Sequence, residues 1–332
     1  MKKMVFGFIK RISLFILLGV LFCVIFNMGS GSSAVMGSGL KPDPITLGEP
    51  PRAMWVWDAK IFQYEDASGR LLKFCNKWNI GTIFYTAYKV TGINTENDYR
   101  RFNAQAHKRG ILVHALAGDP RWGLEKYHHR FLGWANDVLE FNRKARPQER
   151  FDGLHADVEP YLLGKMWEQS KSKMLIEYLE ACSKVRELIK EQQTGIIFAV
   201  DLPFWYDDDT DMWVEWRNKM SPANYHALDI VDEIAIMDYR NFAQGENGSI
   251  LLAKNEIDYA SGIGKKAYIG QETIKELQPE YITFGVKDAD YMEREIKKLV
   301  NVYIDKPGFK GIAMHHYISY KRLLKKSGKA VE

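Results

Sequence analysis

The middle of the chain contains the sequence Phe151-Asp152-Gly153-Leu154-His155-Ala156-Asp157-Val158-Glu159-Pro160-Tyr161. Residues 153–159 form a candidate strand, which is followed by a polar loop and then by a stretch with apolar residues at helical spacing. The same order of strand, loop and helix recurs on both sides of this segment. The predicted strands are residues 53–58, 81–88, 111–118, 153–159, 195–201, 233–239, 266–272 and 311–316.

Helical stretches separate these strands. They are predicted at residues 70–79 (after a Ser68 cap), 98–108, 131–144, 174–190, 250–259, 291–303 and 320–325, and residues 213–228 are less regular. Strands that alternate with helices favour parallel pairing through crossovers. Eight such units between residues 53 and 328 predict one α/β domain with the (β/α)₈ TIM-barrel fold, which typically needs ~250 residues. A doubly wound open sheet is the competing arrangement, but no glycine-rich phosphate loop follows the first strand.

The N-terminus has the pattern of an export signal. Lys2, Lys3, Lys10 and Arg11 precede the apolar run of residues 12–28, and small residues follow at 29–34. Residues 1–34 are therefore predicted to be a signal peptide or membrane anchor, and residues 35–52 a linker rich in Gly, Ser and Pro. We expect a secreted or membrane-tethered, extracytoplasmic protein whose only membrane contact is this segment.

Charge and cysteine content exclude several classes of protein. The chain has 46 basic and 42 acidic residues, and four of the basic residues belong to the N-terminal segment. The remainder is neutral, which argues against sequence-independent binding of nucleic acid. Cys75 and Cys182 fall in two different predicted helices, so neither a disulfide scaffold nor a zinc cluster is expected. We also expect a monomer without a cofactor.

In a (β/α)₈ barrel the catalytic groups lie at the carboxyl ends of the strands, and polar residues gather there in this chain. His155, Asp157 and Glu159 alternate along one strand, so they should face the same barrel mouth. Two neighbouring carboxylates raise the pKa of one of them, and a carboxyl protonated near neutral pH can serve as the general acid that cleaves a glycosidic bond. The alternative is a pair of acids that are solvated or bound by arginine or backbone amides.

The segment from Asp152 to Glu159 resembles the fourth-strand signature of the chitinase-like glycoside hydrolases of family 18, Asp-x-x-Asp-x-Asp-x-Glu. The resemblance implies that Glu159 is the proton donor and that Asp157 orients the acetamido group of the substrate. His155 departs from the pattern, because the family has its middle Asp there. Met237-Asp238-Tyr239 is similar to the Met-x-Tyr of the sixth strand, in which the Tyr holds the reacting group. His315-His316 stand where the family usually has Trp.

A second resemblance concerns the seventh predicted strand, which ends at Glu272. Retaining glycosidases of clan A use a Glu after the fourth strand as acid/base and a Glu after the seventh as nucleophile. That resemblance implies that Glu159 keeps its role and that Glu272 attacks the anomeric carbon. The clan usually has Asn before the acid, where this chain has Val158. A structural cap for the following loop is an equally good interpretation of Glu272.

Aromatic and polar residues at the strand ends are predicted to line a saccharide cleft, because sugar rings stack on aromatic side chains. The predicted substrate-binding residues are Tyr239, Asp238, His155, Trp57, Tyr85, Trp122, Asp201, Trp205, Gln271, His315 and His316. Histidines near strand ends also allow a metal site, but the His-x-His expected on the first strand of metal-dependent hydrolase barrels is missing, so no metal is predicted.

These observations predict a glycosidase that cleaves an extracellular or cell-wall polysaccharide. Glu159 and Asp157 are the expected catalytic residues, with Glu272 as nucleophile in the second mechanism. Two alternatives remain open at this point: a non-catalytic carbohydrate-binding barrel and a metal-dependent hydrolase or deacetylase.

Overall fold

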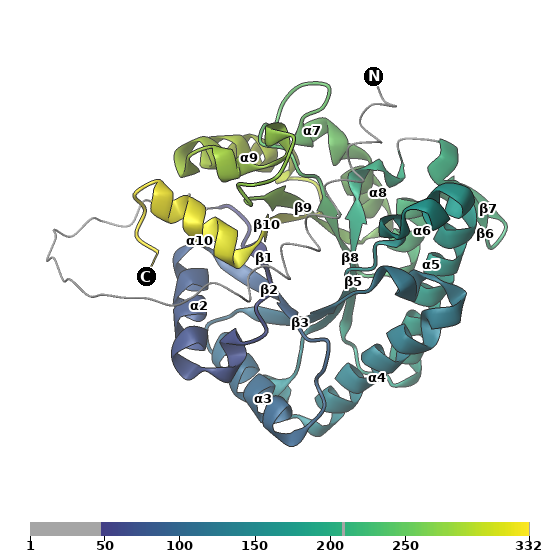
Figure 1. Cartoon of the computed structure of the whole chain (residues 1–332), viewed down its shortest axis with the longest axis horizontal. Helices are drawn as coiled ribbons and strands as arrows, with labels where there is room; N and C mark the ends of the chain where they lie inside the picture. The colour runs from purple at the N-terminus through teal and green to yellow at the C-terminus, as the bar shows by residue number, and fades with distance from the viewer. Residues whose placement is uncertain (1–47, 208–209, 332) are drawn as a thin grey trace, which may run out of the picture.

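The structure, a computed structural model, describes residues 48–207 and 210–331. Within these residues eight parallel strands close into a barrel in the order β1-β10-β9-β8-β5-β4-β3-β2 (Figure 1). The predicted (β/α)₈ fold is confirmed. The strands are β1 (Arg52–Val56), β2 (Ile80–Thr86), β3 (Leu112–Ala117), β4 (Gly153–Ala156), β5 (Ile197–Pro203), β8 (Glu233–Met237), β9 (Lys266–Glu272) and β10 (Phe309–His315).

Helices surround the barrel (Figure 1). They are α2 (Glu65–Lys77), α3 (Ile93–His107), α4 (His128–Lys144), α5 (Lys165–Glu191), α6 (Ala223–Ile230), α7 (Ser249–Leu252), α8 (Lys254–Ile263), α9 (Ala289–Tyr303) and α10 (Tyr317–Lys326). Two predictions need correction. Ser68 lies inside α2, where its hydroxyl donates to the carbonyl of Ile61 and caps nothing. The helix predicted at residues 250–259 is two helices, α7 and α8.

The less regular stretch after β5 forms an antiparallel hairpin. Its strands are β6 (Trp213–Trp216) and β7 (Lys219–Pro222), and α6 follows directly. The hairpin lies outside the barrel sheet, so β5 pairs with β8 as its neighbour in the barrel.

The core has two layers, because strand side chains alternate between the barrel interior and the helices. The inner layer is a small apolar cluster that includes Trp55, Phe84, Leu116 and Tyr268, with Trp57 packed against it. The larger outer layer lies between strands and helices. Gly270 keeps space in the inner layer, since a Cβ there would lie 2.6 Å from the carbonyl oxygen of Ile236.

The N-terminal predictions for residues 1–34 and most of the predicted linker lie outside the described residues. In the part of the chain that the structure describes, no helix combines the length and the apolar character needed to cross a membrane.

Candidate active site

Three carboxyl groups gather where β4 and β5 end. Asp157 and Glu159 follow β4, and Asp201 belongs to β5. The amide of Asp157 donates to the carbonyl of Ala117 at 3.0 Å, which extends the β3–β4 pairing beyond the strand. Gly118 permits this approach, because a Cβ there would lie 1.6 Å from the carbonyl oxygen of Asp157. The close pairing of the two strand ends therefore aims both acids at the mouth.

Burial raises the pKa of all three acids. The pKa of Glu159 and that of Asp157 lie well above their ordinary values, because burial disfavours the charged forms and the neighbouring carboxyls add repulsion. Burial also raises the pKa of Asp201 to about 8, although a hydrogen bond from Trp55 opposes the rise. A proton is therefore available in this cluster near neutral pH, as general acid catalysis requires.

An aromatic wall encloses Glu159. The hydroxyl of Tyr161 donates to Oε2 of Glu159, and the Tyr161 ring lies 5.1 Å from that of Trp205. Tyr206 packs against Trp205 at 4.9 Å and stacks on Trp167 at 6.2 Å. These rings replace water around the carboxyl, which explains the rise in its pKa. Trp205, predicted to line the cleft, belongs to this wall.

His155 lies below the acids inside the barrel. Its Nε2 is 2.8 Å from Oδ1 of Asp201, and its ring centre is 3.9 Å from that of Phe84. The side chain is 1% exposed, and burial lowers the pKa of His155 to about 3, so the imidazole is neutral. The prediction that His155 binds substrate is therefore wrong: it supports Asp201, whose other oxygen accepts a hydrogen bond from Trp55 at 3.1 Å.

A fourth acidic residue, Glu272, lies at the end of β9, which β8 separates from β5, and it is differently bound. Its Oε1 accepts from the amides of Thr273 and Ile274 at 2.6 and 2.7 Å. Its Oε2 lies 2.8 Å from Nδ1 of His315, whose Nε2 accepts from the indole of Trp57 at 3.0 Å. Glu272 is completely buried. Both oxygens are occupied, so this geometry fits a carboxylate that orients His315 rather than a nucleophile.

Tyr239 stands between the two sets of acids. Its ring centre lies 5.7 Å from that of His315. Burial raises the pKa of Tyr239 well above its ordinary value, and the carboxyls of Glu272, Asp201, Asp157 and Glu159 add to the rise. Its hydroxyl therefore keeps its proton and can act as a hydrogen-bond donor.

Four predicted binding residues do not reach the mouth. Tyr85 is buried under α3, with its ring 4.9 Å from Phe102, and Gln271 donates to the carbonyl of Asp238 at 3.1 Å. Asp238 is also fully buried on the helix side, where burial raises its pKa to about 7. Strand alternation turns these three side chains outward. The fourth, Trp122, stacks on Phe131 at 5.4 Å beside α4.

His316 and Tyr88 lie near the mouth in different settings. His316 is half-buried at the start of α10, where its amide donates to Ser319 at 3.0 Å. Tyr88 is 56% exposed, and its hydroxyl donates to the carbonyl of Gly118 at 2.7 Å. Tyr88, Tyr161 and Tyr206 belong to the aromatic residues that the sequence places at or just after strand ends, the feature that predicted a saccharide cleft, but they were not among the predicted binding residues.

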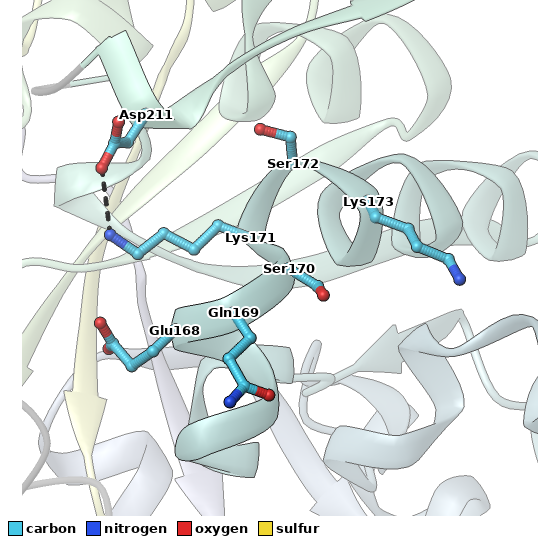
Figure 2. Close-up of a pocket in the computed structure, with 7 residues that line it drawn as sticks. All are labelled: Glu168, Gln169, Ser170, Lys171, Ser172, Lys173 and Asp211. Carbon is cyan, nitrogen blue, oxygen red and sulfur yellow. Dashed lines mark hydrogen bonds and ion pairs between the residues drawn. The ribbon is translucent and has the colours of Figure 1, made fainter.

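The described residues contain no group of three or more His, Cys, Asp or Glu side chains arranged to hold a metal ion. A polar surface pocket of about 340 Å³ lies at a kink in α5, where Ser170 has non-helical dihedral angles (Figure 2). In it Lys171 donates to Asp211 at 3.1 Å. None of the mouth residues lines this pocket, so it is separate from the acid cluster.

Comparison with known proteins identifies the fold. The chain matches no protein-family model and no curated protein sequence. An exo-β-1,4-mannosidase from Opitutaceae bacterium strain TAV5 is 11% identical with a TM-score of 0.51, over 80% of this chain and 51% of that one. A calcium-binding mutant of Bacteroides uniformis β-glucuronidase 2 is 11% identical with a TM-score of 0.50, over 81% and 30%.

A glycoside hydrolase family 18 chitinase from Pseudoalteromonas aurantia is 10% identical with a TM-score of 0.47, over 83% of this chain and 99% of that one. The chain thus spans about half of the mannosidase and under a third of the glucuronidase. At such low identity a likeness extends to the architecture alone. The chain has the (β/α)₈ barrel fold that these glycoside hydrolases share.

Proposed function

We propose that this protein is a glycoside hydrolase that cleaves an N-acetylated polysaccharide of a cell wall or extracellular matrix, with Glu159 as the general acid. The observation that carries the proposal is the buried cluster of Glu159, Asp157 and Asp201, in which the pKa of each carboxyl is raised. A protonated carboxyl at the end of a barrel strand is what leaving-group protonation demands. The resemblance of residues 152–159 to the family 18 signature agrees with this assignment.

In the proposed reaction, Glu159 gives its proton to the glycosidic oxygen as the bond to the anomeric carbon breaks. The acetamido oxygen of the substrate attacks the same carbon, and Asp157 orients that group. Asp157 suits the role because it is half-buried and its Oδ1 has no hydrogen-bond partner. Tyr239 would donate to the attacking group. Water then completes hydrolysis, with Glu159 as the base that accepts its proton.

Glu272 is not the nucleophile in this proposal, because its oxygens accept three hydrogen bonds and its side chain is completely buried. An attacking oxygen needs a free lone pair and a path to the anomeric carbon. Of the two mechanisms that the sequence allowed, the substrate-assisted one therefore fits the geometry better.

The test is release of new reducing ends from bacterial cell-wall and N-acetylated polysaccharides by the purified full chain and its Glu159→Gln variant. Turnover by the parent and its loss in the variant would support the proposal. Undiminished turnover in Glu159→Gln would refute the assignment of the acid.

A non-catalytic carbohydrate-binding barrel is the second candidate, and one observation favours it. Tyr161 already occupies Oε2 of Glu159, whose side chain is only 8% exposed. Tight binding of one polysaccharide with no release of reducing ends would select this candidate.

We also propose that the protein acts as a monomer outside the cytoplasm, secreted or tethered by residues 1–34. The basic, apolar and small-residue order of that segment supports this location. The mass of the mature N-terminus would show whether the segment is cleaved, and a full-length cytoplasmic protein would contradict the proposal.

A further inference from the structure

A chain of hydrogen bonds crosses three neighbouring strand ends, β1, β10 and β9. Trp57 donates from its indole Nε1 to Nε2 of His315 at 3.0 Å. Nδ1 of His315 lies 2.8 Å from Oε2 of Glu272, and two backbone amides hold the other oxygen of Glu272. Glu272 and His315 are 0% and 3% exposed, so water cannot replace these bonds.

The chemistry of the three groups fixes where the protons lie. An indole N–H is only a donor, so Nε2 of His315 must be the unprotonated acceptor. The proton of the neutral ring is then on Nδ1, and it is donated to Glu272. Each group in this series of hydrogen bonds is therefore fixed as donor or acceptor. Reversing the direction of any one bond would place two donors against each other.

This chain determines how Trp57 stands at the mouth. The indole packs on the inner cluster of the barrel, and its N–H edge is held by His315. Trp57 is half-buried, so part of its surface remains exposed. His315 also neighbours Tyr239, whose pKa is raised by burial and by the carboxyls of Glu272 and of the acid cluster. The exposed surface of Trp57 is thus fixed beside the groups of the proposed reaction.

We propose that Trp57 is the platform on which the apolar C–H face of a sugar ring stacks, and that His315 and Glu272 are positioning residues that hold it there. This inference rests on the proposed function, which it deepens by assigning a binding surface. In this proposal Glu272 positions Trp57, and the reaction is carried out by the acids on the β4–β5 side.

Glu272→Gln provides the sharpest test, because it preserves shape and reverses the proton order. The Gln carbonyl can satisfy the two backbone amides, which turns its NH₂ group toward Nδ1 of His315. Nδ1 must then accept, so the ring proton moves to Nε2 and faces the indole N–H of Trp57. We expect this variant to release Trp57 although residue 272 does not touch it.

The first measurement is NMR of the indole N–H groups of the nine tryptophans. The signal absent in Trp57→Phe belongs to Trp57. It should exchange with solvent at least tenfold faster in Glu272→Gln than in the parent, while the signal of Trp55 stays protected. Equal exchange in the parent and in Glu272→Gln would overturn the positioning chain.

The second measurement is kinetic. Trp57→Phe keeps a ring but loses the anchor, and should raise KM about fivefold with little change in kcat, as expected for one neutral hydrogen bond. Trp122→Phe is the matched control, since Trp122 lies in the outer layer, and its KM should not change. In the Glu272→Gln background, Trp57→Phe should raise KM less than twofold, because the anchor is already lost.

The outcomes separate this inference from the proposed function. Loss of turnover in Glu159→Gln with an unchanged KM in Trp57→Phe and Trp57→Ala would leave the glycosidase standing and overturn the platform. If the parent hydrolyses no polymer, titration with N-acetylated oligosaccharides decides: a shift of the Trp57 signal supports the platform. Shifts confined to other indole signals, or no shift at all, overturn it.

Discussion

The two sides of the barrel mouth place the same kind of side chain in different hydrogen-bonding environments. On the β4–β5 side, Glu159 is buried against aromatic rings and accepts a hydrogen bond from Tyr161. On the β9–β10 side, Glu272 is buried more completely but accepts three hydrogen bonds. The difference teaches that burial alone does not make a carboxyl an acid catalyst; the number of donors around it decides between proton donor and anchor.

The strongest test of this difference between Glu159 and Glu272 is to change each of them to Gln. Glu159→Gln removes the proton donor and should lower kcat about 10²-fold or more. Glu272→Gln should lower kcat less than tenfold and act mainly on KM. Steady-state kinetics on the same polymer measures both. Equal losses of kcat in the two variants would mean that the two sides share the reaction.

The second prediction concerns how the free energy of unfolding depends on pH through Asp201, on the β4–β5 side. Folding raises the pKa of Asp201 from its ordinary value of 3.8 to about 8, so the folded state binds more protons than the unfolded state across that range. The contribution of Asp201 to the free energy of unfolding is therefore largest at low pH and falls as pH rises through 8. Linkage gives a loss of about 2 kcal/mol between roughly pH 6.5 and 8.

Asp201→Asn cannot titrate at this position, so its free energy of unfolding should fall less steeply than that of the parent, as denaturant titrations at both pH values would show; the raised pKa values of Asp157, Glu159 and Asp238 leave the rest of the fall in both proteins. The lowered pKa of His155, about 3, also contributes to the free energy of unfolding. That contribution grows only as pH rises toward the ordinary value of 6.5, which is below that window. A parent and variant with parallel pH profiles would show that Asp201 is already ionised in the folded state.

Two tyrosines sharpen the contrast between the mouth and the outer layer. Tyr239→Phe removes a donor that faces the acids, and we expect kcat to fall about tenfold. Tyr85→Phe removes a hydroxyl that accepts from the amide of Phe62 at 2.7 Å beneath α3, and should cost about 1 kcal/mol of stability without changing kcat. Kinetics with thermal unfolding separates these effects. A fall in kcat for Tyr85→Phe would contradict the assignment of its side chain to the outer layer.

The smallest expected effect concerns Tyr161, which donates to Glu159 and so stabilises its charged form. In Tyr161→Phe the pKa of Glu159 should rise further. The limb on which activity is lost with rising pH should then move to higher pH, with a change of only a few-fold in kcat at neutral pH. Rate profiles between pH 5 and 9 would detect the shift. A move to lower pH would show that Tyr161 does not act on the charged form.

The sequence pattern was sufficient to predict the barrel and part of the residues at its mouth. Alternation of apolar runs with helical stretches predicted all eight barrel strands, most of them within one to three residues of their observed ends. Period-two spacing predicted that Asp157, Glu159 and Tyr239 face the mouth. The same rule, applied to Asp238, Gln271 and Tyr85, would have turned them outward, because each is one residue from an inward-facing neighbour.

The sequence by itself determined the order of elements, the strand faces and the presence of acids at the strand ends, because these follow from local periodicity and chain connectivity. Only the tertiary structure decided which carboxyl is surrounded by rings and which by donors, since Trp205, Trp57 and His315 reach them from distant segments. A pKa and a hydrogen-bond pattern depend on neighbours in space, and closure of the barrel supplies those neighbours.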